Sequence, residues 1–142
     1  MDADTRVLRF RSHDPLEHSE LLRPWDLRIN QVSPGKFLGS VDAIATPSML
    51  MYEERWSHRT VVRGSTPPGY VMIGTVQGRR RSRASWCGAK LGFGTLAVGR
   101  PARENHVVGP RSSHQVVVLV QPPALAQGLG NEWLDRNSDS LL

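Results

Sequence analysis

The sequence predicts a single domain built mostly from β-strands, of the sandwich or barrel class. Its 142 residues are enough for one hydrophobic core and too few for two. The 13 Gly and 10 Pro residues favour short strands joined by tight turns over long helices. Short apolar segments recur at intervals of roughly ten residues, which is the spacing of all-β domains.

The N-terminal segment is expected to contain a short helix. Residues 1–11 carry mixed charge and few apolar side chains, so an edge strand and an irregular segment both remain open there. Asp14 and Pro15 are typical of a helix start, since Asp caps free N–H groups and Pro fits the first helical position. We therefore expect a helix over residues 15–22, ended by Pro24.

Nine later segments carry the β pattern of alternating or β-branched apolar residues bounded by turn signals. They are residues 25–31, 37–46, 49–56, 59–63, 70–76, 84–91, 95–98, 106–108 and 114–120. Beyond Gln121 the pattern changes from strand to helix, which predicts a helical tail.

The charge and cysteine content point to a cytoplasmic protein with an anionic partner. The formal net charge is +5, and most of the surplus is arginine between residues 55 and 111. Such a surplus favours nucleic acid, an acidic protein face or an acidic ligand. Cys87 is the sole cysteine, which suits a reducing compartment. The longest aliphatic run, residues 116–120, is far too short to cross a membrane, so no membrane partner is expected.

Several motifs follow one another in a characteristic order. They are a Trp-led strand with Ser-Pro-Gly (25–37), a strand with glutamates (49–56), a Pro-Pro-Gly turn (66–74), a Gly-x-Gly turn (86–96) and a strand running into Pro (116–123). In this order and spacing they resemble the cupin-like N-terminal domain of AraC-type transcription regulators. The resemblance extends from residue 14 to residue 123.

The resemblance implies a cupin-like antiparallel β-barrel, jelly-roll-like, that takes a small-molecule effector in its lumen and forms a homodimer. It divides the chain into an N-terminal extension with a short helix (1–22), the barrel sensor domain (23–122) and the start of a linker helix (123–142). In that family a helix-turn-helix domain follows and contacts DNA. On this interpretation the chain lacks that domain, and DNA is reached only through it.

An effector pocket is the main candidate site. The resemblance places six side chains around the barrel lumen: Tyr52, Glu54, Trp56, Tyr70, Met72 and Trp86. Ordinary core packing explains the aromatic residues slightly better than ligand contact does. Glu54 distinguishes core packing from ligand contact better than the aromatic residues do. A carboxylate cannot be buried alone, so it must pair with an arginine, contact a ligand, or face outward. A strand phase shifted by one residue exchanges Glu54 for Glu53.

A basic loop supports a second function hypothesis, a β-barrel that binds nucleic acid. The loop carries Arg79, Arg80, Arg81 and Arg83, which can contact phosphates or another anionic partner. Trp86 lies nearby in sequence and would stack a base. The simpler interpretation of the arginines is a solvated hairpin loop.

Enzymatic sites find little support, so we expect no catalytic residue, metal or cofactor. The chain has no His-x-His and no Gly-x-Ser-x-Gly. A third function hypothesis remains, a small metal-dependent cupin enzyme that uses His58, His106 and His114. Cys87 is expected to be a small buried hydrophobe within a strand.

Overall fold

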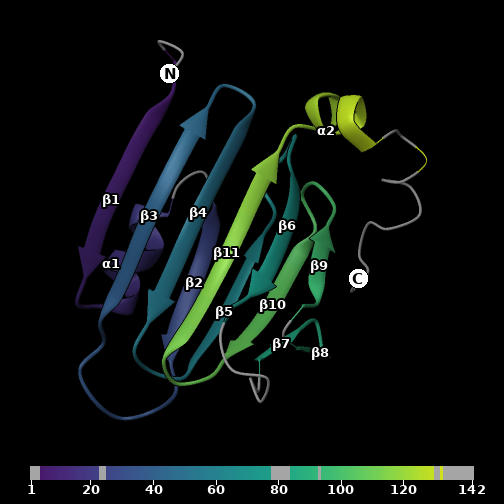
Figure 1. Cartoon of the computed structure of the whole chain (residues 1–142). Helices are drawn as coiled ribbons and strands as arrows, with labels where there is room; N and C mark the ends of the chain where they lie inside the picture. Colours follow the sequence, from purple (N-terminus) through teal and green to yellow (C-terminus); the bar gives the residue numbers. More distant parts are fainter. Residues whose placement is uncertain (1–3, 23–24, 78–83, 93, 130–131, 133–142) are drawn as a thin grey trace.

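The computed structural model describes residues 4–22, 25–77, 84–92, 94–129 and 132. This part of the chain forms eleven β-strands and two α-helices, arranged as two facing sheets (Figure 1). All strand pairs are antiparallel. The prediction of a mostly β, antiparallel domain is therefore confirmed.

Sheet A has six strands in the order β1-β3-β4-β11-β6-β9. They are β1 (Arg6–Ser12), β3 (Gly39–Thr46), β4 (Met49–Trp56), β11 (Ser113–Val120), β6 (Val71–Val76) and β9 (Leu96–Gly99). The N-terminal segment thus contributes an edge strand, which was one of the two alternatives left open by its sequence. The central strand β11 pairs along its whole length with β4.

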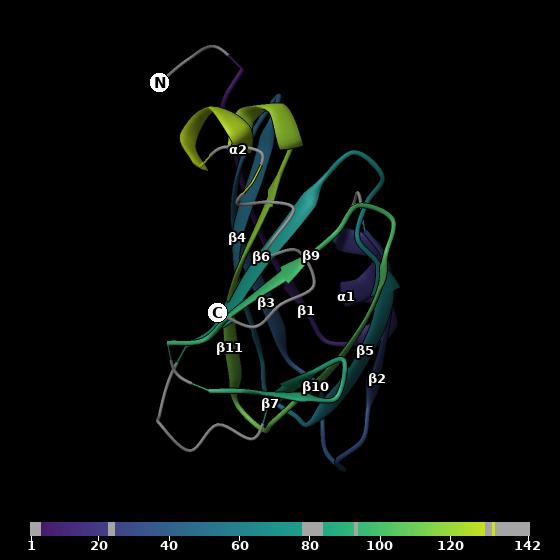
Figure 2. The same cartoon turned by 90° about the vertical axis from the view of Figure 1, so that its right-hand side faces the viewer.

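Sheet B has five strands in the order β2-β5-β10-β7-β8. They are β2 (Asp26–Gln31), β5 (Thr60–Ser65), β10 (Glu104–Gly109), β7 (Ala84–Trp86) and β8 (Ala89–Leu91). Figure 2 shows sheets A and B as two layers seen from the side. Each sheet keeps two edge strands, so the described strands form a sandwich, and closure into a barrel is not confirmed.

The first helix, α1 (Pro15–Leu21), begins as its sequence predicts. The carboxylate of Asp14 accepts hydrogen bonds from the backbone N–H groups of Leu16 and Glu17, at 2.8 and 3.2 Å. This cap satisfies two of the donors that a helix start leaves free. The helix contacts β1 of sheet A and β2 of sheet B, so it connects the two sheets at one side of the sandwich.

The second helix, α2 (Pro122–Leu129), follows β11 directly. It lies at one end of sheet A, on the side away from sheet B (Figure 2). There Ala124 and Leu125 pack against the outward-facing valines Val71, Val98 and Val120. Neither described helix is long and apolar enough to cross a membrane.

One predicted strand, residues 84–91, is wrong in detail because the chain turns in its middle. Trp86 pairs with Ala89, and the two residues between them, Cys87 and Gly88, have φ of 48° and 83°. Two consecutive positive φ values are typical of the tight hairpin turn that joins antiparallel strands. Cys87 is therefore exposed at a hairpin tip, and the expectation that it is buried is wrong.

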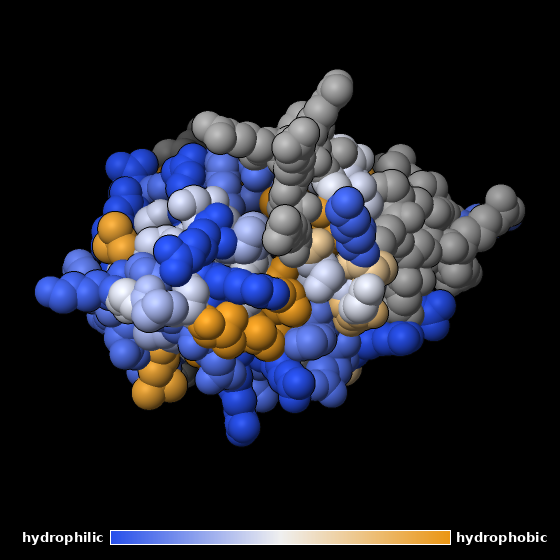
Figure 3. Space-filling view, turned by 90° about the horizontal axis from the view of Figure 1, so that it is seen from below, coloured by the Kyte–Doolittle hydropathy of each residue, from blue (hydrophilic) through white to orange (hydrophobic). Residues whose placement is uncertain are grey.

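The hydrophobic core lies between the two sheets. Strand β4 sends Tyr52, Glu54 and Trp56 inward and Glu53 and Arg55 outward. The end of the sandwich opposite α2 is predominantly hydrophilic, with a few apolar patches (Figure 3). Among the described residues, nine large hydrophobic side chains are exposed: Val7, Leu8, Leu16, Leu21, Val32, Leu38, Ile44, Met51 and Leu96.

Candidate functional site: an internal cavity and a buried polar network

A cavity of about 70 Å³ lies between the two sheets. Five of the six side chains predicted for the effector pocket line it: Tyr52, Glu54, Trp56, Met72 and Trp86. The sixth, Tyr70, is half-buried and packs against the core without lining the cavity. The wall also includes Trp25, Gly74 and Gln115. The fold therefore brings most of the predicted residues together.

The size of the cavity restricts what it can hold. A water molecule takes up roughly 30 Å³ in the liquid, so about two waters would fill it. Pockets for drug-sized ligands are several times larger, at roughly 300–1,000 Å³. The wall is mostly apolar, with one carboxylate and a few hydrogen-bonding groups. Only a compact molecule fits without movement of the sheets.

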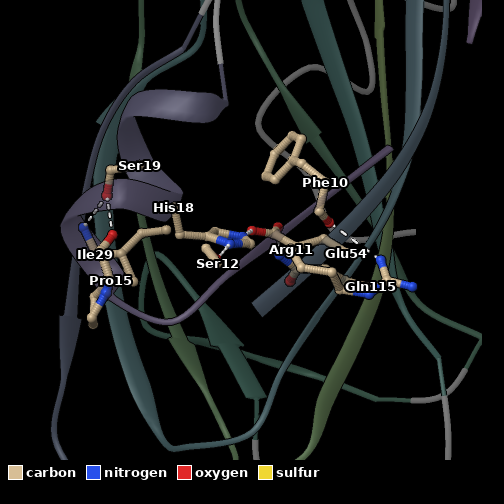
Figure 4. A network of polar contacts seen from close by, with 9 residues as sticks. All are labelled: Phe10, Arg11, Ser12, Pro15, His18, Ser19, Ile29, Glu54 and Gln115. Carbon is tan, nitrogen blue, oxygen red and sulfur yellow. Dashed lines mark hydrogen bonds and ion pairs between the residues drawn. The ribbon is translucent and has the colours of Figure 1, made fainter. Parts of the chain in front are cut away.

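The carboxylate of Glu54 is buried and fully paired. Its Oε1 lies 2.7 Å from Nε2 of His18, and its Oε2 accepts a hydrogen bond from the side-chain amide of Gln115 (Figure 4). The inward phase predicted for this strand is therefore correct. The partners are a histidine and a glutamine, whereas the sequence left open an arginine, a ligand or an outward position. Glu53 lies on the opposite face of β4, where it pairs with Arg55 and His114.

His18 is the centre of the polar network. Its side chain is 0% exposed, and its Nδ1 lies 2.5 Å from the hydroxyl of Ser12. With the proton on Nε2, the imidazole donates to Glu54 and accepts from Ser12, which satisfies both ring nitrogens. The rings of Phe10 and Phe37 contact its edge or face at centroid distances of 5.8 and 5.7 Å.

Sequence reasoning missed His18, to which it assigned no role. The inward face of α1 carries His18, Ser19 and Leu22, so it lacks the apolar stripe that marks a buried helix face. Ser19 also ties the helix to sheet B, because its hydroxyl accepts the backbone N–H of Ile29 at 3.1 Å. The network thus links α1 to both sheets (Figure 4).

Ser12, His18 and Glu54 are the residue types of a nucleophilic triad. Here they form a buried chain of hydrogen bonds that holds α1 against sheet A. The Ser12 hydroxyl is fully buried, and neither Ser12 nor His18 lines the cavity. A nucleophile needs space for a substrate carbonyl next to its oxygen. This serine has none, so we assign the set a structural role.

Trp86 is held by a second polar chain on the opposite wall. Its indole N–H donates to Oδ1 of Asn105 at 2.9 Å, and the Asn105 amide donates to the hydroxyl of Thr66 at 2.7 Å. Trp86 is buried, so it cannot stack a base as the nucleic-acid hypothesis requires. The arginines of that hypothesis, Arg79, Arg80, Arg81 and Arg83, lie outside the described residues.

Two other indoles in the cavity wall have unused hydrogen-bonding capacity. The N–H groups of Trp25 and Trp56 are buried and make no hydrogen bond of acceptable geometry. Trp25 is nevertheless close enough to Tyr52 to oppose a rise in its pKa. Burial raises the pKa of Tyr52 well above its ordinary value, and the negative charge of Glu54 adds to the rise. The Tyr52 hydroxyl is therefore a neutral donor at physiological pH.

The raised pKa of Tyr52 predicts a loss of stability at alkaline pH. The folded state keeps this proton where the unfolded state releases it, so the contribution is intact below about pH 10 and is lost as pH rises further. We expect the free energy of unfolding to fall less steeply above that pH in Tyr52→Phe, whereas Tyr70→Phe serves as the matched control. Tyrosinate absorbance checks the assignment: ionisation of Tyr52 near pH 10 in protein that is still folded would contradict it.

The described residues contain no group of three or more His, Cys, Asp or Glu side chains placed to hold a metal ion. His58 contacts the Ser57 hydroxyl at 2.7 Å, and His114 contacts Glu53 at 2.5 Å. His106 lies on β10 opposite Arg63. The three histidines of the metal-enzyme hypothesis thus have separate surroundings.

Comparisons with known proteins show a similarity of fold to a solved structure. No protein-family model matches the sequence, and no curated protein matches it. Among solved structures, the chain is similar to the AraC-like transcriptional activator CuxR, with a TM-score of 0.65 and 13% sequence identity. The alignment covers 95% of this chain and 54% of that one, so the chain spans about half its length. The likeness confirms, at the level of fold, the resemblance expected from the sequence.

Proposed function

We propose that this chain is the ligand-sensing and pairing domain of an AraC-type transcription regulator. The observation that carries the proposal is the fold shared with a transcriptional activator over 95% of the chain. The cavity between the sheets supports the sensing part, since its wall is mostly apolar and includes a few polar side chains. The domain acts by binding and not by catalysis, and DNA contact belongs to another part of the regulator.

The proposed effector is compact and bears hydrogen-bond acceptors. The cavity admits few atoms, and its wall carries the indoles of Trp25 and Trp56 and the hydroxyl of Tyr52, which are hydrogen-bond donors. Glu54 places a carboxylate in the wall, with His18 and Gln115 on its two oxygens, and this negative charge disfavours an anionic ligand. A small uncharged molecule with carbonyl or hydroxyl oxygens fits these conditions.

Filling the cavity is expected to abolish the response to such a molecule. Gly74 lines the cavity, and a Cβ added there would meet only the flexible side chain of Met72 at 3.2 Å and Val117 at 3.9 Å. Gly74→Val therefore occupies the space with little strain and suits a strand. Small polar compounds that shift the indole N–H signals of Trp25 and Trp56 in NMR spectra should leave those of Gly74→Val unchanged.

The same spectra contain an internal control. The indole N–H of Trp86 already has a partner in Asn105, so its signal should move less than those of Trp25 and Trp56. Single Trp→Phe variants assign the signals. The sensing proposal fails if no uncharged acceptor shifts them, or if the shifts persist in folded Gly74→Val.

A further inference from the structure

A groove of about 390 Å³ lies on the outer side of sheet A, at the end opposite α2. At this end β1 and β4 finish and β3 and β11 begin (Figure 1), and Figure 3 views it from below. Most of its lining side chains carry N–H or O–H donors, among them Arg11, Ser40, Arg55, Ser57, Ser112 and His114. The volume falls in the range of small-molecule sites, roughly 300–1,000 Å³, so the groove can hold more than a single ion.

The strand registers place three basic side chains of the groove in one row. Arg11 on β1 lies opposite Ser40 on β3, and Ser40 lies opposite Arg55 on β4. His114 on β11 follows opposite Arg55. Neighbouring strands are about 4.8 Å apart, so the backbones of Arg11 and Arg55 are about 10 Å apart, with Ser40 between them. Two long guanidinium side chains can therefore contact one anion from both sides, above a hydroxyl group at the floor.

The groove carries more positive than negative charge. One oxygen of the Glu53 carboxylate contacts both Arg55 and His114. Arg11 forms no ion pair with another residue that the structure describes, and its guanidinium donates to the backbone carbonyl of the preceding residue at 3.2 Å. The next carboxylate, that of Glu54, faces the core on the opposite side of the sheet. Two permanent positive charges thus stand against one negative charge on this part of the face.

Several donors of the groove are uncommitted. The hydroxyls of Ser40 and Ser112 form no hydrogen bond with another described residue. Arg55 has five N–H donors, and its contact with Glu53 uses one terminal nitrogen. No Asp or Glu side chain among the described residues lines the groove. The wall therefore offers donors from β1, β3, β4 and the turn before β11 and no competing carboxylate.

We propose that this groove binds a phosphate group, either as the free ion or as the ester of a small molecule. A phosphate carries up to two negative charges and offers at least three acceptor oxygens, which suits two guanidinium groups with hydroxyls between them. A carboxylate has two oxygens in one plane and would leave the hydroxyls of Ser40 and Ser112 unused. The inference goes beyond the proposed sensing function, because the sensing cavity lies between the sheets and shares only Trp56 with the groove.

The test is an NMR titration of the isotope-labelled whole chain with inorganic phosphate, near neutral pH and at constant ionic strength. The Nε–H signals of Arg11 and Arg55 should shift in a saturable manner. Arg11→Gln and Arg55→Gln should each weaken binding about tenfold, because each removes a charge-assisted contact. Arg63→Gln makes the same charge change on the exposed face of β5 in sheet B, so it should alter the affinity less than about twofold.

Two further variants separate a defined site from general attraction to a positive surface. Ser40→Val keeps the net charge and suits a strand, but it removes the central hydroxyl and should weaken binding about threefold. Glu53→Gln frees Arg55 and His114 from their shared carboxylate and removes a negative charge. It should therefore tighten binding, which a merely destabilising substitution would not do.

Methyl phosphate distinguishes the two sources of the phosphate group. Tighter binding than that of inorganic phosphate assigns the groove to an ester, and weaker binding assigns it to the free ion. The proposal is overturned if inorganic phosphate binds no more tightly than acetate. It is also overturned if Arg11→Gln and Arg55→Gln, with native circular dichroism, bind phosphate as the wild type does. A single-stranded oligonucleotide that shifts the groove signals when neither small phosphate does would overturn it as well and assign the arginines to nucleic acid.

Discussion

His18→Leu is expected to destabilise the protein by about 3–5 kcal/mol, the usual cost of removing one partner of a buried ion or hydrogen-bonded pair. The substitution leaves the carboxylate of Glu54 buried with Gln115 as its remaining partner and frees the hydroxyl of Ser12. Leucine fills much of the imidazole volume, so the loss is polar and not a cavity effect. Urea or thermal unfolding measures it, with an expected fall in the melting temperature of roughly 10 °C or more.

A double-mutant cycle separates the pair from packing. Glu54→Leu alone should also destabilise, because it strands His18 without an acceptor. The double variant His18→Leu/Glu54→Leu should be more stable than the sum of the single losses predicts, since two apolar residues need no partner. Leu16→Ala on the exposed side of α1 should change stability by less than about 0.5 kcal/mol. Strictly additive losses would show that the network does not act as a unit.

The role of this network explains why α1 belongs to the domain. A seven-residue helix is too short to be stable by itself. Its buried contacts run through His18 to β4 of sheet A and through Ser19 to β2 of sheet B. We therefore infer that α1 joins the two sheets through buried hydrogen bonds at the edge of the sandwich formed by β1 and β2. Loss of the contacts between α1 and the sheets should change the position of Glu54, and therefore the shape of the cavity wall to which Glu54 belongs.

The sequence was most informative where local patterns dominate. Strand β4 has the predicted bounds, 49–56, and the alternation that turns Glu54 inward is visible in its sequence. The start of α1 follows from Asp14 and Pro15, whose effects act within one helical turn. Such features depend on neighbouring residues alone, so they need no knowledge of how the sheets are arranged.

The features that were missed depend on tertiary arrangement or on unusual backbone geometry. The turn at Cys87 and Gly88 needs a non-glycine residue at positive φ, which is uncommon and carries no clear signal at a cysteine. The partner of Glu54 lies 36 residues away on a helix whose inner face is polar. One outward apolar residue on each strand of sheet A lines up across the sheet: Val7, Ile44, Met51, Val118, Ile73 and Val98. These strands are scattered along the chain, so the alignment appears only when the strand order is known.

Gly39→Ala should disturb the same network from the backbone side and destabilise the protein by about 1–3 kcal/mol, the usual cost of overpacking. A Cβ added at Gly39 would lie 2.7 Å from Cε1 of His18 and 2.7 Å from the Ser12 hydroxyl. Both side chains are fully buried, so neither can move away into solvent. The methyl group must displace the imidazole and weaken its contacts with Ser12 and Glu54.

Gly74→Ala is the matched control for this substitution. Both glycines lie in strands of sheet A, but the Cβ at Gly74 borders the cavity and approaches only the flexible Met72 closely, at 3.2 Å. Any general cost of replacing a strand glycine is therefore shared, and we expect Gly74→Ala to be close to neutral. Denaturant unfolding of the two variants gives the difference. Moreover, Gly39→Ala should cost less in a His18→Ala background, where removal of the imidazole leaves space for the added methyl group; an unchanged cost there would place the strain elsewhere than at His18.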